Sequence, residues 1–186
     1  TYKVPCPHID DIIQYATDKN LLNILWFFTN EDHKFVDMHG HTMKKRYCPY
    51  LDKACRKGYD TIVEFVVQHY PDKTDRLLQK PIPTINKVLE QGFLKILKLI
   101  VPRVTLINNM VSGLKSAALH NHIHTLEYAF QHLNRTSIPD IPYSVMIVAS
   151  EFGHLEILKL CVQNSKSEPN IPIDAFYTAF QNGHFY

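Results

Sequence analysis

Histidine is the residue type in this chain best suited to chemistry, because 11 of the 186 residues are histidine. Five of them stand at alternate positions in the segments HGH and HNHIH: His39, His41, His120, His122 and His124. Neutral imidazoles at close spacing can bind zinc. Alternate side chains converge only on an extended strand, however, and residues 120–124 are expected to cross a turn between two helices. We therefore expect no metal site and no cofactor.

A cysteine hydrolase needs a thiolate beside a base that a third group orients. Cys55 and Cys161 fall on the apolar faces of expected helices, where a thiol acts as a small hydrophobic side chain. Cys48 is the one plausible nucleophile, because its linker also contains Asp37, His39 and His41. The chain contains no Gly-rich phosphate loop, GxSxG elbow or HExxH motif. These patterns predict a protein that is not an enzyme.

Composition narrows the possible partners. The 20 basic and 18 acidic residues give a net charge of +2 and are spread evenly along the chain, which argues against nucleic-acid binding. The short basic run Lys44–Arg46 is expected to be a solvated loop. No apolar run approaches the length of a membrane span, and the first residues are not a signal peptide. Four scattered cysteines without a CxxC pair favour reduced thiols, and so an intracellular, cytoplasmic protein.

The segment ASEFGHLEILKLCVQ, which begins at Ala149, recurs along the chain. Other copies begin at Ala16, Ala54, Val88 and Ala118, and a truncated one begins at Ala179. Aligning them gives one anchor residue per copy: Asn20, Gly58, Gly92, His122, Gly153 and Gly183. A small or aliphatic residue stands four before each anchor, and an aliphatic one stands four after it in each complete copy. A single amphipathic helix would not recur in the same internal frame, so the pattern indicates a repeat.

Each copy is expected to form two helices joined at its anchor. Glycine reaches the left-handed conformation of a helix C-cap without steric cost, and asparagine tolerates it, so His122 is the exception. Two short helices cannot bury their own apolar faces, whereas a stack of five or six pairs makes one continuous core. Four aromatic residues at helical spacing are expected in that core: Trp26, Phe27, Phe28 and Phe65. The predicted fold is an all-α solenoid of stacked helix-turn-helix units.

The segment Ala149–Val162 resembles the ankyrin repeat, whose Ala-rich inner helix ends at Gly-His before an outer helix. The segment DMHGHT, residues 37–42, is similar to the hairpin tip that precedes an ankyrin inner helix, but the family's Thr-Pro-Leu-His start is absent. Copies closer than the usual ~33 residues imply shortened or irregular hairpin loops. Such divergent copies are similar to those of ankyrin proteins from intracellular bacteria, protists and large DNA viruses, which implies host interaction and, for a pathogen protein, the host cytoplasm.

The repeat predicts a single ankyrin-like domain over residues 1–186. Its units are expected at residues 8–36, 37–80, 81–110, 111–140, 141–172 and, incomplete, 173–186. The last copy stops where its second helix should begin, which would leave half covered Ala175, Phe176, Ala179 and Phe180. We therefore expect the chain to be a fragment of a longer repeat protein.

The residues just before each anchor vary while the frame around them repeats, which makes them the natural place for specificity. They predict a surface that binds another protein along the concave inner-helix face and adjoining loops, formed by Arg56, Lys57, Glu90, His120, Asn121, Glu151 and Phe152. Phe152 is the strongest candidate, since an aromatic side chain at an exposed position can anchor a partner. The alternative is an inert scaffold that positions a catalytic domain elsewhere in a longer chain.

Overall fold

The computed structural model describes residues 4–5, 8–29, 35–36, 48–69, 82–103, 110–133, 143–165 and 171–184. It separates into two compact units, Thr1–Leu78 (unit 1) and Gln79–Tyr186 (unit 2), which we describe one at a time. Both units are helical. The only strands among the described residues are two residues long, β1 (Val4–Pro5) and β2 (Phe35–Val36), and they pair in parallel.

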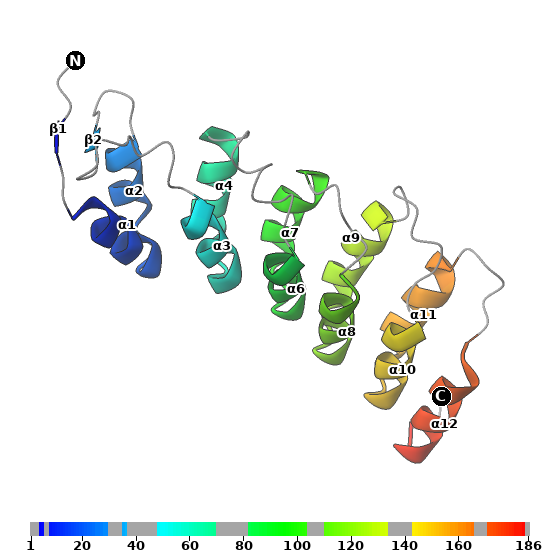
Figure 1. Cartoon of the computed structure of the whole chain (residues 1–186). Coiled ribbons are helices and arrows are strands. Elements are labelled where there is room, and N and C mark those ends of the chain that lie inside the picture. Colours follow the sequence, from blue (N-terminus) through cyan, green and yellow to red (C-terminus); the bar gives the residue numbers. More distant parts are fainter. Residues whose placement is uncertain are drawn as a thin grey trace. The chain divides into compact units, whose positions relative to one another are not determined.

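The described residues of unit 1 form two helix pairs (Figure 1). The first pair is α1 (Ile9–Asp18) and α2 (Leu22–Thr29), and the second is α3 (Cys48–Lys57) and α4 (Asp60–His69). Within each pair the helices contact one another, and α1 also packs against α3. The first helix of each pair therefore forms the layer that joins the pairs.

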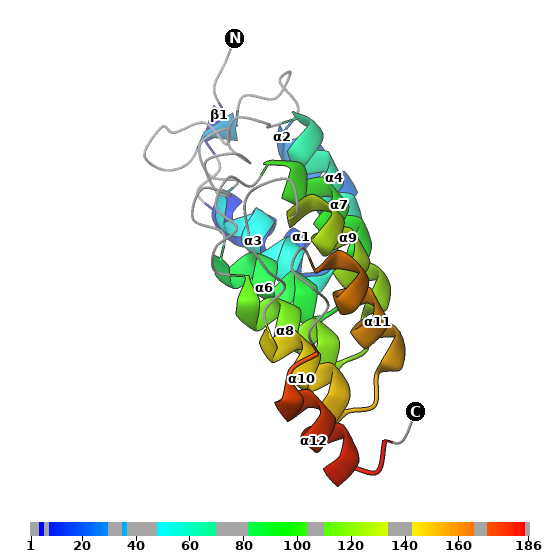
Figure 2. The same ribbon diagram turned by 90° about the vertical axis from the view of Figure 1, so that its right-hand side faces the viewer.

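Unit 2 repeats this arrangement with three pairs and a further helix. The first helices are α6 (Ile82–Glu90), α8 (Val111–Leu119), α10 (Tyr143–Glu151) and α12 (Ile173–Gln181). The second helices are α7 (Leu94–Ile100, followed by the 3₁₀ turn Val101–Arg103), α9 (Ile123–Leu133) and α11 (Leu155–Asn164). First helices pack in chain order against first helices, and second helices against second helices, so unit 2 has two layers (Figure 2). In both units we call the first helices, including α12, the inner helices and the second helices the outer helices.

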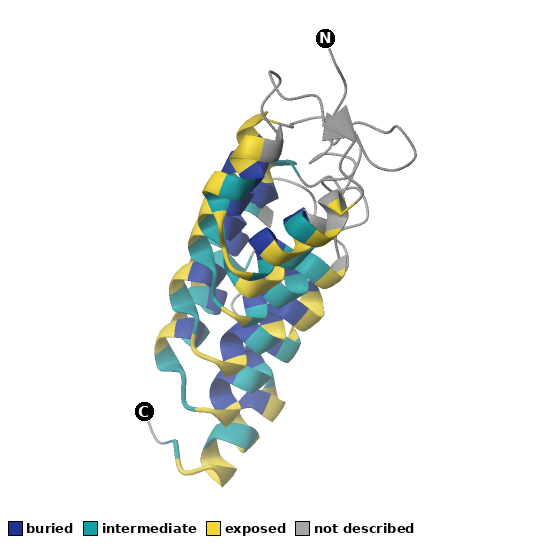
Figure 3. Cartoon of the chain, turned by 90° about the vertical axis from the view of Figure 1, so that its left-hand side faces the viewer, coloured by how far each residue is buried: buried dark blue, intermediate teal, exposed yellow. Residues whose placement is uncertain are grey.

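The core lies between these layers, and Figure 3 colours the buried residues of the helices dark blue. Small residues let the inner helices approach closely: Ala54, Ala117 and Ala149 are fully or almost fully buried. The expectation for Phe65 is confirmed, because it is 8% exposed, but that for Trp26 and Phe27 is wrong, since they are 53% and 46% exposed. Trp26 lies six residues after the turn residue Asn20, and the residues at that distance after the turn in the outer helices of unit 2 are also exposed. The side chain of Phe28 lies outside the described residues.

The inner helices α6 and α8 approach one another closely at Gly113. A Cβ atom there would lie 2.7 Å from the Cα atom of Asn86, so only glycine fits without moving backbone. Asn86 uses this proximity: its Oδ1 atom accepts the N–H of Gly113 at 3.2 Å, and its Nδ2 atom donates to Ser112 Oγ at 2.7 Å. A side chain of α6 thus caps the first turn of α8, which otherwise leaves N–H groups without helical partners.

Membrane insertion finds no support in the described helices. The longest of them, α9, has 11 residues, whereas a helix needs about 20 to cross a bilayer. Across the described ranges, no helix is long and apolar enough to serve as a membrane span.

Candidate protein-binding surface

A left-handed residue stands at the end of every inner helix. The positive φ angles belong to Asn20 (55°), Gly58 (78°), Gly92 (70°), Asn121 (57°), Gly153 (67°) and Gly183 (75°). In each turn the left-handed N–H donates to the carbonyl three residues earlier, and the next N–H donates to the carbonyl five residues before it, as in Gly153→Ser150 and His154→Ala149. These two bonds are the Schellman motif, which satisfies the last carbonyls of a helix. The six copies therefore share one turn.

The expectation that His122 is the anchor of the fourth copy is wrong. Asn121 takes the left-handed conformation, one residue earlier. The correct frame places buried Thr125, rather than Leu126, four residues after the turn residue. It also explains the missing glycine, since asparagine is the residue that best tolerates this conformation after glycine. Asn121 was expected to bind a partner, but its backbone belongs to the repeated frame while its side chain is exposed.

The corrected frame places a histidine directly after three turn residues in unit 2. His122 Nε2 lies 3.0 Å from the carbonyl of Glu90, His154 Nε2 lies 3.2 Å from that of Leu119, and His184 Nε2 lies 3.1 Å from that of Glu151. A carbonyl can only accept, so Nε2 carries the hydrogen in each bond. Each accepting carbonyl belongs to the residue two before the preceding turn residue. We call these three bonds the histidine ladder.

Unit 1 makes the same connection with a different side chain. Tyr59 follows the turn residue Gly58, and its hydroxyl donates to the carbonyl of Asp18 at 2.9 Å. Asp18 is two residues before Asn20, which is the corresponding position. Phe93, directly after Gly92, has no side-chain donor, so the ladder depends on the residue type at this position.

The ladder fixes the spacing of successive turns, and the predicted binding residues of unit 2 stand at those turns. Glu90 is half-buried, whereas His120, Glu151 and Phe152 are exposed. Two of these residues have rings that lie near ladder histidines. The ring centroids of Phe152 and His154 are 6.2 Å apart, and those of His120 and His122 are 5.9 Å apart. We call Glu90, His120, Glu151 and Phe152 the turn surface. Phe152 remains 46% exposed, so an apolar anchor is presented to solvent.

The charges of the turn surface differ in how far they are already paired. Glu90 accepts hydrogen bonds from Lys87 and from Gln91. Lys87, and to a lesser extent Gln91 and His120, hold the pKa of Glu90 below its usual value. Glu151 has no ion-pair partner among the described residues. Glu151 is therefore the carboxylate of this surface most available to a cationic partner.

In unit 1 the predicted binding residues lie beside Asp18. Lys53 Nζ and Lys57 Nζ lie 2.7 Å and 2.9 Å from Asp18 Oδ1. The two lysines lower the pKa of Asp18, and Asp18 in turn raises the pKa of Lys57. Arg56 Nε lies 2.9 Å from Asp52 Oδ2 one helical turn earlier. The positive charges of Arg56 and Lys57 thus have intramolecular partners, which a binding partner would have to share or replace.

Sequence reasoning missed the residues that support this surface. The link between Asp18 and the α3 lysines spans 35 and 39 residues, and nothing in the local pattern signals it. The ladder histidines left a signal, since Gly-His recurs, but the carbonyl that each one contacts is visible only in three dimensions. The sequence around Lys53 and Tyr59 contains no pattern that distinguishes them from other polar residues.

The described residues include some of the candidates for a cysteine nucleophile and for a metal site. Burial raises the pKa values of the Cys55 and Cys161 thiols to about 12, so both are neutral and poorly nucleophilic at pH 7. Asp37, His39, His41 and the Cys48 side chain lie outside the described residues, as does the segment 37–42. In the part of the chain that the structure describes, no three His, Cys, Asp or Glu side chains are grouped to hold a metal ion. His120, His122 and His124 form no such cluster.

Comparison with known proteins adds no family to these observations. No protein-family model matches the chain, and a search of curated proteins gives no significant match.

Proposed function

We propose that the chain is a solenoid of ankyrin-like repeats that recognises another protein, without a cofactor and without catalysis of its own. Six copies of one Schellman turn, with helix pairs in two layers in unit 2, support the repeat. The proposed family rests on the resemblance of Ala149–Val162 to ankyrin sequences. The likeness of the divergent copies to ankyrin proteins of intracellular microbes and viruses suggests a host protein as the partner. An intracellular setting fits the scattered cysteines.

The observation that carries the binding function is the turn surface itself. The histidine ladder holds its backbone, so exposed side chains of differing chemistry project from fixed positions. A preorganised surface loses less conformational entropy when it binds. Phe152 supplies an exposed aromatic group and the neighbouring Glu151 an available carboxylate. Together they suit a partner that offers an apolar pocket beside a basic side chain.

A pull-down from cell lysate, read by mass spectrometry, tests this proposal. The test variant is Glu151→Ala with Phe152→Ala, and the matched control is Glu156→Ala with Tyr143→Ala, which also removes one exposed carboxylate and one exposed aromatic ring. We expect one protein to be captured by the wild type and the control and lost by the test variant. Equal capture by all three proteins would exclude the turn surface as the binding site.

The scaffold remains the second candidate, because one observation favours it. Arg56, Lys57 and Glu90 already have ion-pair partners within their own units. A surface whose charges are already paired gains little from a new ionic contact. A chain that captures no protein in the same experiment would support this scaffold role.

A further inference from the structure

The exposed side of α12 carries a continuous apolar stripe. Its members are spaced at i, i+3, i+4 and i+7, so they share one helix face: Ile173, Phe176, Tyr177 and Phe180. They are 68%, 61%, 62% and 68% exposed. The opposite side contains Ala175, which is 1% exposed in the layer where α12 packs on α10. The expectation that Ala175 is half covered is therefore wrong, while Phe176 and Phe180 are exposed.

Two residues of the stripe can be compared with the residues at the same distance from the turn in the other inner helices. Phe176 and Phe180 stand seven and three residues before the turn residue Gly183. The corresponding residues are buried in every other inner helix of unit 2: Ile85 and Leu89, Leu114 and Ala118, Met146 and Ser150. Each of those helices packs against the next inner helix along the chain. Phe176 and Phe180 thus occupy positions that elsewhere in unit 2 face a neighbouring helix. The described counterparts of Ile173 and Tyr177 are exposed or half-buried, so these two residues extend the stripe beyond the repeated contact.

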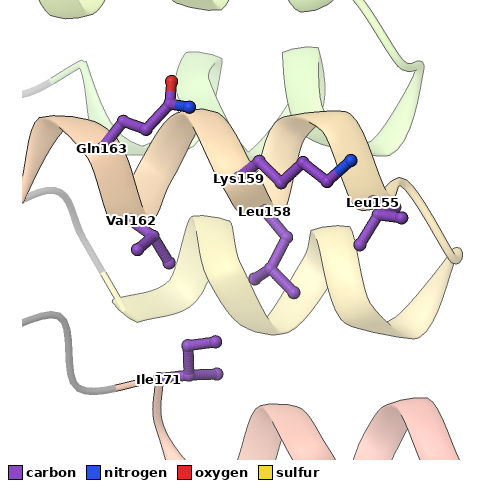
Figure 4. A pocket seen from close by; sticks show the side chains of 6 residues that line it. All are labelled: Leu155, Leu158, Lys159, Val162, Gln163 and Ile171. Carbon is purple, nitrogen blue, oxygen red and sulfur yellow. The ribbon is translucent and has the colours of Figure 1, made fainter. Parts of the chain in front are cut away.

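The outer layer shows the same exposure beside it. Leu158 and Val162 of α11 are half-buried, whereas their counterparts Leu97 and Val101, and Leu126 and Phe130, are buried. With Leu155 and Ile171 they line an apolar hollow of about 310 Å³, which Lys159 and Gln163 border (Figure 4). Because Ile171 is separated from the first residue of α12, Ile173, only by the N-cap Pro172, the hollow adjoins the stripe. Both layers of unit 2 therefore present apolar surface at this end.

We propose that the α12 stripe is a dimer interface, occupied by the α12 stripe of a second copy in antiparallel, twofold-symmetric packing. The stripe contains no charge, and Asp174 is the only charged side chain of α12. Antiparallel packing places the two Asp174 carboxylates at opposite ends of the interface, so they do not repel one another closely. The aromatic rings of the two copies can interleave in the offset or edge-to-face contacts that such rings prefer.

The apolar area of the stripe reaches the lower bound of the area that a specific protein interface buries. Four large side chains at about two-thirds exposure present on the order of 500 Å² per copy. Two copies would then bury about 1,000 Å², the lower bound for a specific interface, and the adjoining hollow adds apolar area toward the usual ~1,200–2,000 Å². None of the turn-surface residues takes part. The dimer proposal and the proposed recognition function can therefore fail separately.

Sedimentation velocity of the purified 186-residue chain, from about 1 µM to about 100 µM, tests the proposal. We expect the mass to rise with concentration and to level off at twice 21.6 kDa. In Phe176→Glu with Phe180→Glu, a buried carboxylate should raise the dimer dissociation constant at least about tenfold. The neutral variant Phe176→Gln with Phe180→Gln should weaken the dimer in the same direction. Circular dichroism should show unchanged helix content, since the rings of Phe176 and Phe180 are both exposed in the monomer.

Tyr15→Glu serves as the control, because it places the same charge on an exposed ring of unit 1, outside both the stripe and the turn surface. It should dimerise like the wild type. The proposal is overturned if the wild type stays monomeric, if its mass continues to rise beyond the dimer, as in head-to-tail association, or if both folded α12 variants dimerise like the wild type. Loss of the dimer in Tyr15→Glu alone would also overturn it.

Discussion

At the scale of single residues, the turn glycines differ in what surrounds them. Gly92 and Gly183 have φ angles of 70° and 75°, so a side chain at either position is strained by the backbone to the same degree. A Cβ atom at Gly92 would lie 2.6 Å from His122 Nδ1, whereas a Cβ atom at Gly183 would meet nothing within 4 Å. The pair therefore separates backbone strain from the effect on the histidine ladder.

We predict that Gly183→Ala lowers the free energy of unfolding by about 1 kcal/mol, the cost of a left-handed alanine. Gly92→Ala should cost at least about 1 kcal/mol more, because it also displaces His122 from the Glu90 carbonyl. Denaturant unfolding measures both. In a His122→Ala background the extra cost of Gly92→Ala should disappear. Equal costs for the two glycines in the wild-type background would contradict the ladder's contribution.

Asp18 makes stability depend on pH. Its pKa is lowered in the folded chain from the ordinary value of 3.8, so it stabilises the fold above that value and loses this contribution as the pH falls through the folded pKa. We predict that Asp18→Asn is less stable than the wild type at pH 6 and that the difference shrinks by pH 3. Thermal unfolding across this range measures it. A difference that does not change with pH would show that the lysines do not act through the Asp18 charge.

At the scale of helices, the contact between α6 and α8 depends on the absence of a side chain at Gly113. Gly113→Ala would place its Cβ atom 2.6 Å from Asn86 Oδ1 and 2.7 Å from the Asn86 Cα atom. Although alanine favours helices, we predict that this substitution lowers the free energy of unfolding by about 2 kcal/mol, because packed backbone must move. Denaturant unfolding measures the loss. If the Gly113→Ala variant is as stable as the wild type, α6 and α8 can move apart without a cost in the free energy of unfolding.

Local sequence gave most of the helices, because the pattern repeats around residues with special backbone angles. Gly58, Gly92, Gly153 and Gly183 were located correctly, since glycine marks the left-handed turn. The fourth turn was placed one residue late, because Asn121 and His122 are both polar and Leu126 matches the aliphatic position better than Thr125 does. Their helical spacing predicts Trp26 and Phe27 in the core, but spacing does not show which face of α2 is covered. Phe27 and buried Phe65 both lie seven residues after a turn residue, yet Phe27 is exposed.

The candidate surface was less predictable than the helices. The exposure of His120, Glu151 and Phe152 follows from the turn, and sequence spacing was enough to suggest it. The ion pairs of Asp18 and the carbonyl contacts of the ladder join residues more than 30 positions apart. Such contacts depend on how helix pairs pack, which a local pattern does not encode. Sequence therefore indicated which residues are exposed, but not which charges are already paired.

At the scale of whole units, stability should vary along unit 2. In the described residues α10 packs between α8 and α12, whereas the extensive helix packing of α12 is with α10. In repeat proteins, stability is the sum of each repeat and its neighbouring interfaces. We predict that amides of Ile173–Gln181 exchange hydrogen faster than those of Tyr143–Glu151, measured by mass spectrometry on dilute protein. Equal protection of the two helices in the monomer would contradict this difference.

We propose that the turn surface of unit 2 contacts a partner protein, and site-specific photo-cross-linking in cells tests this contact. A photoreactive phenylalanine analogue at Phe152 is compared with the same analogue at Glu127, an exposed residue of the outer helix α9 that belongs to neither the turn surface nor the α12 stripe. We predict a discrete protein adduct from position 152 and none from position 127. Adducts of equal intensity from both positions, or from position 127 alone, would contradict recognition through the turn surface.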